Sequence, residues 1–231
     1  MQIEAAVDQA GLAGKKAPLT YSVSSDVLMV AQPSGPGAEG VRALRTRLVA
    51  SHIEVGRRAL ALCAASAGVG CTFVATNLAI ALSQIGVKTL LVDADMRRPG
   101  VDLLLQPSAR TEGLMQCLST DDTNYSSYIE ADIMPNLSVM YAGGTPDNPQ
   151  ELLAGARFEE LMNFCLRDYE MTIIDTPPTN VCADGRRVST VAGYSVVVAR
   201  RNHSRIDDLK LLIEQLRHDR ASVVGTILNE I

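Results

Sequence analysis

The residues best suited to chemistry form a glycine-rich segment between an apolar run and a helical pattern, Ala64-Ala65-Ser66-Ala67-Gly68-Val69-Gly70-Cys71-Thr72. Successive backbone N–H groups of such a turn, together with a helix N-terminus, form a nest for an anion. Against the phosphate-loop pattern G-x-x-x-x-G-K-[ST], Gly70 and Thr72 are in place, and Cys71 stands where lysine is expected. The predicted phosphate-binding residues are Ala67, Gly68, Val69, Gly70, Cys71 and Thr72, with the Thr72 hydroxyl available to Mg²⁺.

The substitution at Cys71 removes the cation that normally spans the terminal phosphates. Losing a charge-assisted contact of this kind costs about 1.5–3 kcal/mol. Taken alone, the loop is equally consistent with an ordinary glycine turn that binds no ligand. The thiol itself has two possible interpretations: it is a small packing group, or it is a reactive thiol whose pKa is lowered by the helix N-terminus.

Carboxylates stand at the ends of two further apolar runs. Val92-Asp93-Ala94-Asp95 puts two acids two residues apart, which on a strand places them on one face. Such a pair suits a hydrated Mg²⁺ or the positioning of water. Ile173-Ile174-Asp175 has the form of the second acid that holds Mg²⁺ in phosphate-loop ATPases. We predict Asp93 and Asp95 as catalytic residues, and Thr72, Asp93 and Asp175 as metal-binding residues.

These residues need a scaffold that brings strand ends together. Alternating apolar and helical patterns predict a mostly parallel α/β sheet with helices on both faces, because helical crossovers join parallel strands. Ligands of such sheets bind at the carboxyl ends of the strands. The expected strands are 59–65, 88–95, 137–141, 171–175, 194–199 and 223–228, and the expected helices are 38–51, 72–85, 150–167 and 204–218.

Composition narrows the function classes. The 231 residues carry a net charge of −5, which argues against a nucleic-acid partner. Five cysteines without metal-ligand spacing indicate reduced thiols in a cytoplasmic protein. No apolar run approaches the roughly 18 residues of a membrane span. Residues 1–26 read as a poorly ordered arm, and residues 27–231 as one phosphate-loop domain with a three-layer sandwich.

The three histidines give weaker evidence of function, and so do the two arginines at the end of the fifth expected strand. His52, His203 and His218 are dispersed, and we predict surface or capping roles for them. Arg200 and Arg201 end a strand at the expected ligand edge, where a solvated strand end is favoured over contact with a nucleotide.

The combination of motifs resembles the cytoplasmic kinase domain of the bacterial tyrosine kinases of capsule and exopolysaccharide assembly. The match consists of the loop 65–72, the Asp-x-Asp motif running into Arg97-Arg98-Pro99, and Asp175-Thr176-Pro177-Pro178. It extends over about residues 27–231. The resemblance implies an ATP or ADP site with Mg²⁺, an adenine contact by Asn229, a further acid at Asp184, and ring-like self-association through Glu39, Arg42 and Arg45.

Two features depart from that family. The loop lysine is Cys71, and the C-terminal tyrosine cluster that serves as autophosphorylation substrate is missing. Tyr125 and Tyr128 come nearest to a pair, in a polar loop, and we favour surface and packing roles for them. The sister family of partitioning and septum-positioning ATPases is a less favoured alternative, because Ser66 and Cys71 occupy its two lysine positions.

The resemblance implies a cytoplasmic ATP-binding protein that regulates polysaccharide polymerisation and export. Its partner would be the cytoplasmic tail of a Wzz-like inner-membrane polysaccharide copolymerase, which would hold it at the membrane, and it would form a homo-oligomer. Three hypotheses stay open: an autokinase in which Arg97, Arg98 or a partner cation replaces the lysine, a pseudokinase that switches assembly on nucleotide binding, and a structural ring subunit.

Overall fold

A seven-stranded sheet forms the centre of the computed structural model, which describes residues 2–4 and 19–230. Its strand order is β10-β9-β3-β8-β4-β7-β6, and every neighbouring pair is parallel except β6 with β7. The strands are β3 (Ala59–Ala64), β4 (Thr89–Asp93), β6 (Glu130–Met134), β7 (Leu137–Met140), β8 (Met171–Asp175), β9 (Tyr194–Arg200) and β10 (Ser222–Asn229). The expected mostly parallel α/β sheet is confirmed.

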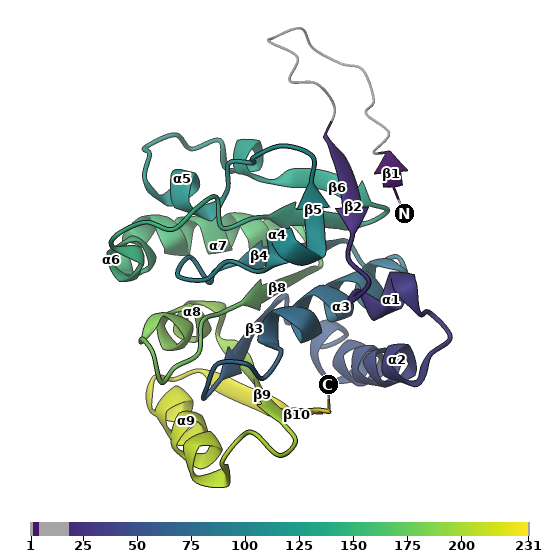
Figure 1. Ribbon diagram of the computed structural model, residues 1–231. Helices are drawn as coiled ribbons and strands as arrows, with labels where there is room; N and C mark the ends of the chain where they lie inside the picture. The colour runs from purple at the N-terminus through teal and green to yellow at the C-terminus, as the bar shows by residue number, and fades with distance from the viewer. Residues whose placement is uncertain (1, 5–18, 231) are drawn as a thin grey trace, which may run out of the picture.

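Helices cover both faces of this sheet (Figure 1), with α2 and α3 on one face and α7, α8 and α9 on the other. The alternation of side chains along β3 explains the two layers: Leu60 and Leu62 pack with α3, whereas Ala61 and Cys63 pack with α8. The helices are α1 (Leu28–Ala31), α2 (Pro36–Leu48), η1 (Val49–Ile53), α3 (Cys71–Ser83), α4 (Val101–Leu104), α5 (Leu114–Leu118), η2 (Tyr125–Tyr128), α6 (Pro149–Ala154), α7 (Ala156–Asp168), α8 (Asp184–Ala192) and α9 (Ile206–His218).

Two expected helices differ from the observed ones. The helix expected over 150–167 is divided at Gly155, whose extended backbone (φ −64°, ψ 155°) ends α6 and begins α7. The helix expected over 38–51 begins earlier, at Pro36, and continues from Leu48 into the π-helical turn η1. Proline at the first helical position fits there because its missing N–H has no intrahelical partner in any case.

A second, small sheet lies at the N-terminal side, in the order β1-β2-β5 (Gln2–Glu4, Thr20–Val23 and Leu105–Pro107). Within the segment 1–26, expected to be a poorly ordered arm, residues 2–4 and 20–23 thus form strands of this sheet. There, β2 pairs antiparallel with β5 and buries Tyr21, whose hydroxyl donates a hydrogen bond to Glu130 at 3.1 Å. Residues 1 and 5–18 of that segment lie outside the described residues.

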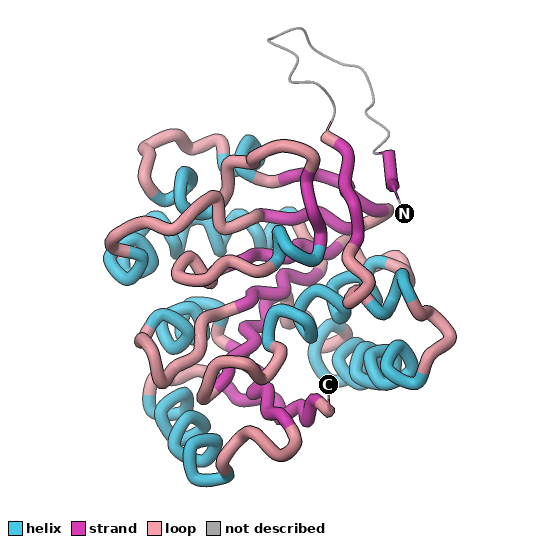
Figure 2. The backbone as a smooth tube through the Cα atoms, in the orientation of Figure 1, coloured by secondary structure: helices cyan, strands magenta, loops and turns pink. Residues whose placement is uncertain are grey.

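The parallel strands end at one edge, where the motifs predicted from the sequence meet. Figure 2 shows the strands as one twisted magenta band with cyan helices on both sides. β3 leads directly into the glycine-rich loop, and in the β4–β8 pair Asp93 lies beside Asp175. This register brings two acids that are distant in the sequence next to each other.

Candidate functional site

The glycine-rich loop runs from the end of β3 to Gly70, and α3 begins at Cys71. Gly68 (φ +75°) and Gly70 (φ +84°) both adopt the left-handed conformation that favours glycine. A Cβ atom on Gly70 would lie only 2.3 Å from the Asn229 amide nitrogen. Glycine is therefore required at position 70 both by the backbone conformation and by the close approach of Asn229.

The loop borders a cavity of about 330 Å³ at the carboxyl edge of the sheet. Its walls come from the loop, from the turn after β4 and from the turn after β8. The lining residues include Ser66, Ala67, Gly68, Val69, Gly70, Cys71, Thr72, Asp95, Arg97, Arg98, Thr176, Pro177 and Pro178. All six predicted loop residues line this cavity.

The Cys71 thiol points back into the sheet. Its Sγ donates a hydrogen bond to the Leu62 carbonyl oxygen at 3.2 Å. Burial raises the pKa of the Cys71 thiol well above its usual range, and the nearby Asp175 charge raises it further. The buried, hydrogen-bonded thiol favours the first of the two interpretations, a small packing group. Cys71 is a neutral group that supplies no positive charge to the cavity.

Asp175 is the most unusual acid of the site. It is fully buried, and neither of its carboxylate oxygens has a hydrogen bond of normal geometry to a described residue. Burial raises its pKa from 3.8 to about 7, although the nearby Thr72 hydroxyl and Cys71 thiol act in the opposite direction. A buried carboxylate without partners is costly unless another group satisfies it.

These residues fit Mg²⁺. Asp175 and Thr72 together offer the hard oxygen ligands that Mg²⁺ prefers. Among the described residues, no group of three or more histidine, cysteine, aspartate or glutamate side chains is placed to hold a metal ion. Mg²⁺ is commonly held by one or two protein groups, with water and phosphate oxygens as its other ligands.

Asp93 lies next to Asp175 but is fully engaged by backbone groups. One carboxylate oxygen accepts a hydrogen bond from the N–H of Asp95 (3.1 Å), and the other accepts from Gly100 (3.1 Å) and Val101 (3.0 Å). Burial, followed by the charge of Asp175, raises the pKa of Asp93 well above its usual range. In this arrangement Asp93 fixes the turn that follows β4.

Asp95 lies beyond the end of β4, so the expectation that both acids share one face of a strand is wrong. The strand ends at Asp93, and the Asp93 carboxylate itself turns the chain there. Asp95 accepts hydrogen bonds from the N–H groups of Arg97 (3.1 Å) and Arg98 (2.9 Å). It also lines the cavity, which Asp93 does not.

The arginines after the acids differ in their partners. Arg97 forms an ion pair with Asp184 (Nε to Oδ2, 2.7 Å), and the Asp184 side chain is only 1% exposed. Arg97 is therefore held by a buried acid and not free in the cavity. Within residues 19–230, Arg98 forms no ion pair, and it too lines the cavity.

Asn229 at the end of β10 contacts the loop directly. Its amide donates a hydrogen bond to the Val69 carbonyl oxygen at 2.9 Å. It also lines a smaller cavity of about 260 Å³ on the other side of the loop, together with Leu28, Phe73 and Arg200. Arg200 and His203 also contact the loop, by hydrogen bonds to Gly68 and Ala67. Local sequence patterns give no signal for these two contacts.

The predicted oligomer motif lies on α2. Arg42 forms an ion pair with Glu39 (3.1 Å) and donates to the Pro33 carbonyl oxygen. Arg45 donates to the Ala81 carbonyl oxygen of α3 at 3.3 Å. Glu39 is 75% exposed. The three side chains share one helix, and all three already contact groups of their own chain.

None of the six tyrosines presents a freely exposed side chain. Five are buried, and Tyr194 is half-buried with the Arg57 guanidinium 4.7 Å from its ring centre. Tyr125 and Tyr128 are each 9% exposed in η2, and the Tyr125 hydroxyl donates to Glu160 at 3.0 Å. Of the surface and packing roles favoured for this pair, the structure therefore supports packing.

Comparison with known proteins identifies the family. The model of the AAA domain family matches residues 57–219. The kinase domain of the Escherichia coli tyrosine kinase ETK is 31% identical, with a TM-score of 0.83 over 89% of this chain and 80% of that one. The chain belongs to the bacterial tyrosine kinase domains. The resemblance inferred from the motifs is thus confirmed, and the fold implies a nucleotide site.

The relatives of the bacterial tyrosine kinase domain include longer proteins. The tyrosine-protein kinase Wzc of Salmonella typhimurium is 31% identical over 207 residues, which make up 90% of this chain and 28% of Wzc. This chain therefore spans less than a third of that relative. The cell division ATPase MinD of Pyrococcus furiosus is 22% identical with a TM-score of 0.63, over 75% of this chain and 72% of that one, a likeness of fold alone. Among the described residues, no helix has the length and apolar character needed to cross a membrane.

Proposed function

We propose that this domain binds Mg·ATP at the glycine-rich loop and, from the cytoplasm, regulates the polymerisation and export of a bacterial exopolysaccharide. The observation that carries the proposal is the buried Asp175 carboxylate, which lacks normal hydrogen-bond partners and lies beside Thr72. A buried carboxylate of this kind is costly unless a ligand satisfies it, and a metal–phosphate ligand fits the loop that lies next to it.

In the proposed complex the loop N–H groups hold the phosphates, and Thr72 and Asp175 hold the metal. Mg²⁺ would neutralise phosphate charge when it is bound. Asp93 supports this arrangement by fixing the turn after β4. Asp95 is the acid that lines the cavity, and we assign to it the orientation of an acceptor hydroxyl or a water molecule.

A nucleotide-controlled switch without efficient phosphoryl transfer is the second candidate, and Cys71 favours it. The thiol is neutral and bonded to Leu62, so it cannot stabilise charge that develops on the transferred phosphoryl group. Arg97 is held by Asp184. Kinase activity would then be weak or would depend on a cation from a partner.

The proposed partner is the cytoplasmic tail of a Wzz-like membrane copolymerase, and the proposed assembly is a homo-oligomer through Glu39, Arg42 and Arg45. Five of the six tyrosines are buried, and a buried phenol cannot reach the nucleotide site of a neighbouring subunit. A tyrosine that accepts phosphate would therefore belong to another polypeptide segment. An Arg45→Glu protein that assembles as wild type does, measured by analytical ultracentrifugation, would contradict the interface.

The test compares wild type with Cys71→Lys and the matched control Cys71→Ala. Calorimetry should detect binding of Mg·ATP to the wild type, and the alanine variant should bind equally. The lysine variant should bind about 10- to 100-fold more tightly, the gain expected from one charge-assisted contact of about 1.5–3 kcal/mol. Turnover and transfer of labelled phosphate to tyrosine should rise in the lysine variant alone. Absence of Mg·ATP binding by the wild type would refute the nucleotide function and leave the structural ring subunit.

A further inference from the structure

Three consecutive carbonyl groups of the loop are each bonded by a side chain from outside the loop. The Ala67 oxygen accepts from His203 Nε2 (2.9 Å), the Gly68 oxygen from Arg200 Nη1 (3.0 Å), and the Val69 oxygen from Asn229 Nδ2 (2.9 Å). A carbonyl oxygen can only accept, so His203 Nε2 carries the proton in this contact. All three donors come from the end of β9, the turn after it, or the end of β10.

These contacts determine which way the loop N–H groups point. In a trans peptide unit, the carbonyl and the following N–H point in opposite directions. Holding the carbonyl groups of residues 67, 68 and 69 outward therefore turns the N–H groups of Gly68, Val69 and Gly70 toward the other side of the loop. That side faces the larger cavity, where the phosphates bind in the proposed function.

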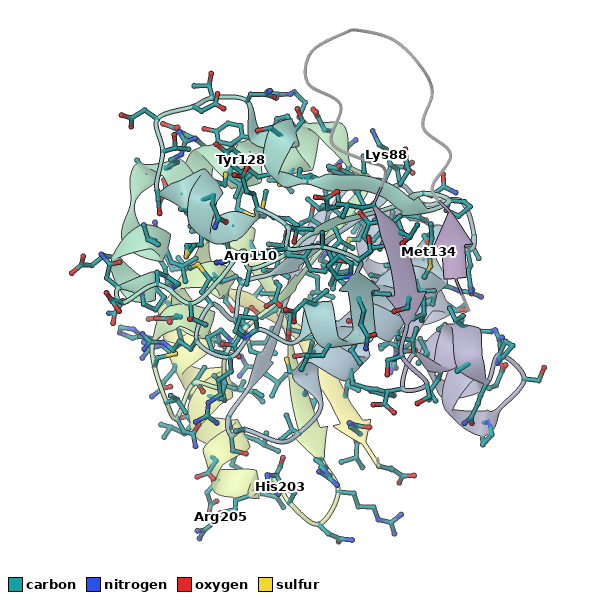
Figure 3. The ribbon with its side chains drawn as sticks, turned by 45° about the horizontal axis from the view of Figure 1, so that its top comes forward. Lys88, Arg110, Tyr128, Met134, His203 and Arg205 are labelled. Carbon is teal, nitrogen blue, oxygen red and sulfur yellow. The ribbon has the colours of Figure 1, made fainter. Side chains whose placement is uncertain are left out.

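The donors are themselves held in place. The backbone N–H of Arg200 donates to Ser204 Oγ at 2.9 Å, and the N–H groups of His203 and Ser204 donate to the Arg200 carbonyl oxygen at 3.2 and 3.0 Å. Figure 3 labels His203 at the edge of the sheet where β9 and β10 end. The turn thus presents two side chains at fixed positions against the outer surface of the loop.

We infer that Arg200 and His203 are positioning residues that keep the loop in its phosphate-binding conformation in a chain without the loop lysine. Neither lines the phosphate cavity, so they act through the loop rather than as phosphate ligands. Arg200 also places a positive charge beside the loop. The expected effect of these two side chains on nucleotide affinity rests on the proposed function. Their effect on the loop conformation does not, because that conformation can be measured without nucleotide.

The same turn provides a matched control. Arg201 follows Arg200 directly, is 65% exposed, and pairs with Glu230 at 3.2 Å without contacting the loop. His203→Gln is the conservative variant, since a glutamine amide can donate to the same carbonyl oxygen.

The binding experiment uses Mg·ATP and tripolyphosphate as probes, measured by calorimetry on the full chain. His203→Ala and Arg200→Ala should each bind both probes about ten-fold more weakly, the effect of losing one ordering hydrogen bond. His203→Gln should regain most of the affinity, and Arg201→Ala should match wild type. Equal affinities in all variants would overturn the inference, and so would a loss for Mg·ATP alone, which would assign Arg200 to the base or ribose.

The second measurement is amide hydrogen exchange of residues 68–70 without nucleotide. Exchange at these amides should be faster in His203→Ala and Arg200→Ala than in Arg201→Ala, while the amides of β3 stay protected. Unchanged exchange would refute the positioning role. A wild type that binds neither probe would refute the proposed nucleotide function, and this exchange comparison would still test the contacts independently.

Discussion

Replacing Asp175 by asparagine should stabilise the fold at pH 7 and above even though it removes the proposed metal ligand. The carboxylate is fully buried beside Asp93 and has no hydrogen bond of normal geometry. Its ionised form is therefore unfavourable in the folded protein and is well solvated in the unfolded chain. Natural proteins often keep such a destabilising group where function needs it.

The magnitude follows from the pKa. The pKa of Asp175 rises from 3.8 to about 7, a change that corresponds to about 4 kcal/mol. Below pH 3.8 the carboxyl is protonated in both states and the penalty is absent. As the pH rises toward 7, the unfolded chain ionises first and folding becomes less favourable, and above pH 7 the penalty is constant. The buried asparagine amide needs partners of its own, which costs about 1–3 kcal/mol at every pH.

Urea unfolding at pH 5, 6, 7 and 8, without divalent metal, provides the measurement. The free energy of unfolding of Asp175→Asn minus that of wild type should become more positive by about 3 kcal/mol between pH 5 and pH 8. Asp102→Asn, at an exposed acid of α4, controls for removal of one negative charge. A difference that stays constant or falls with pH would refute the reasoning, because it would mean that the folded protein stabilises the Asp175 charge.

Two further substitutions, each measured by urea unfolding, test the ion pair beside the cavity and a close glycine contact elsewhere in the fold. Arg97→Ala should lower the free energy of unfolding by about 1–3 kcal/mol, because it leaves the buried Asp184 carboxylate unpaired. Arg97→Lys should recover part of this loss. If the alanine variant is as stable as wild type, the ion pair does not stabilise the fold. Gly113→Ala should lower the free energy of unfolding by about 1–3 kcal/mol, since the new Cβ would lie 2.0 Å from the Tyr141 carbonyl oxygen. Gly40→Ala, in an exposed and open part of α2, should raise it by about 1 kcal/mol. Similar effects of the two substitutions would show that the close contact at Gly113 does not matter.

The elements at the centre of the site could be predicted because their signals are local. The apolar run of β3, the glycine loop and the start of α3 are consecutive in the sequence, and Asp175 directly ends an apolar strand. The parallel sheet then brings these strand ends to one edge by topology alone. The sequence therefore predicts which residues meet there, and the structure adds how each one is bonded.

The remaining features depend on contacts between distant residues. His203 and Arg200 bond loop carbonyl groups 136 and 132 positions away, and no periodicity reports such a pair. The pairing of β2 with β5 likewise joins segments more than 80 residues apart. The expectation that Asp93 and Asp95 share one face of a strand was wrong for a different reason. The Asp93 side chain accepts a hydrogen bond from the backbone of the next turn, where the strand ends, so the two-residue period of a strand no longer applies.

Cys71 alters the charge balance of the site more than its shape. The loop conformation is accounted for by Gly68, Gly70 and the outer hydrogen bonds, none of which involves position 71. A lysine there would contribute one positive charge close to Asp175, and the neutral thiol leaves that acid uncompensated. Phosphates that enter the cavity meet the Asp95 carboxylate of its lining, with Asp175 buried nearby, and need a metal ion to offset this negative charge. The substitution should therefore make nucleotide affinity depend more steeply on Mg²⁺, and Cys71→Lys should reduce that dependence even if it restores no turnover.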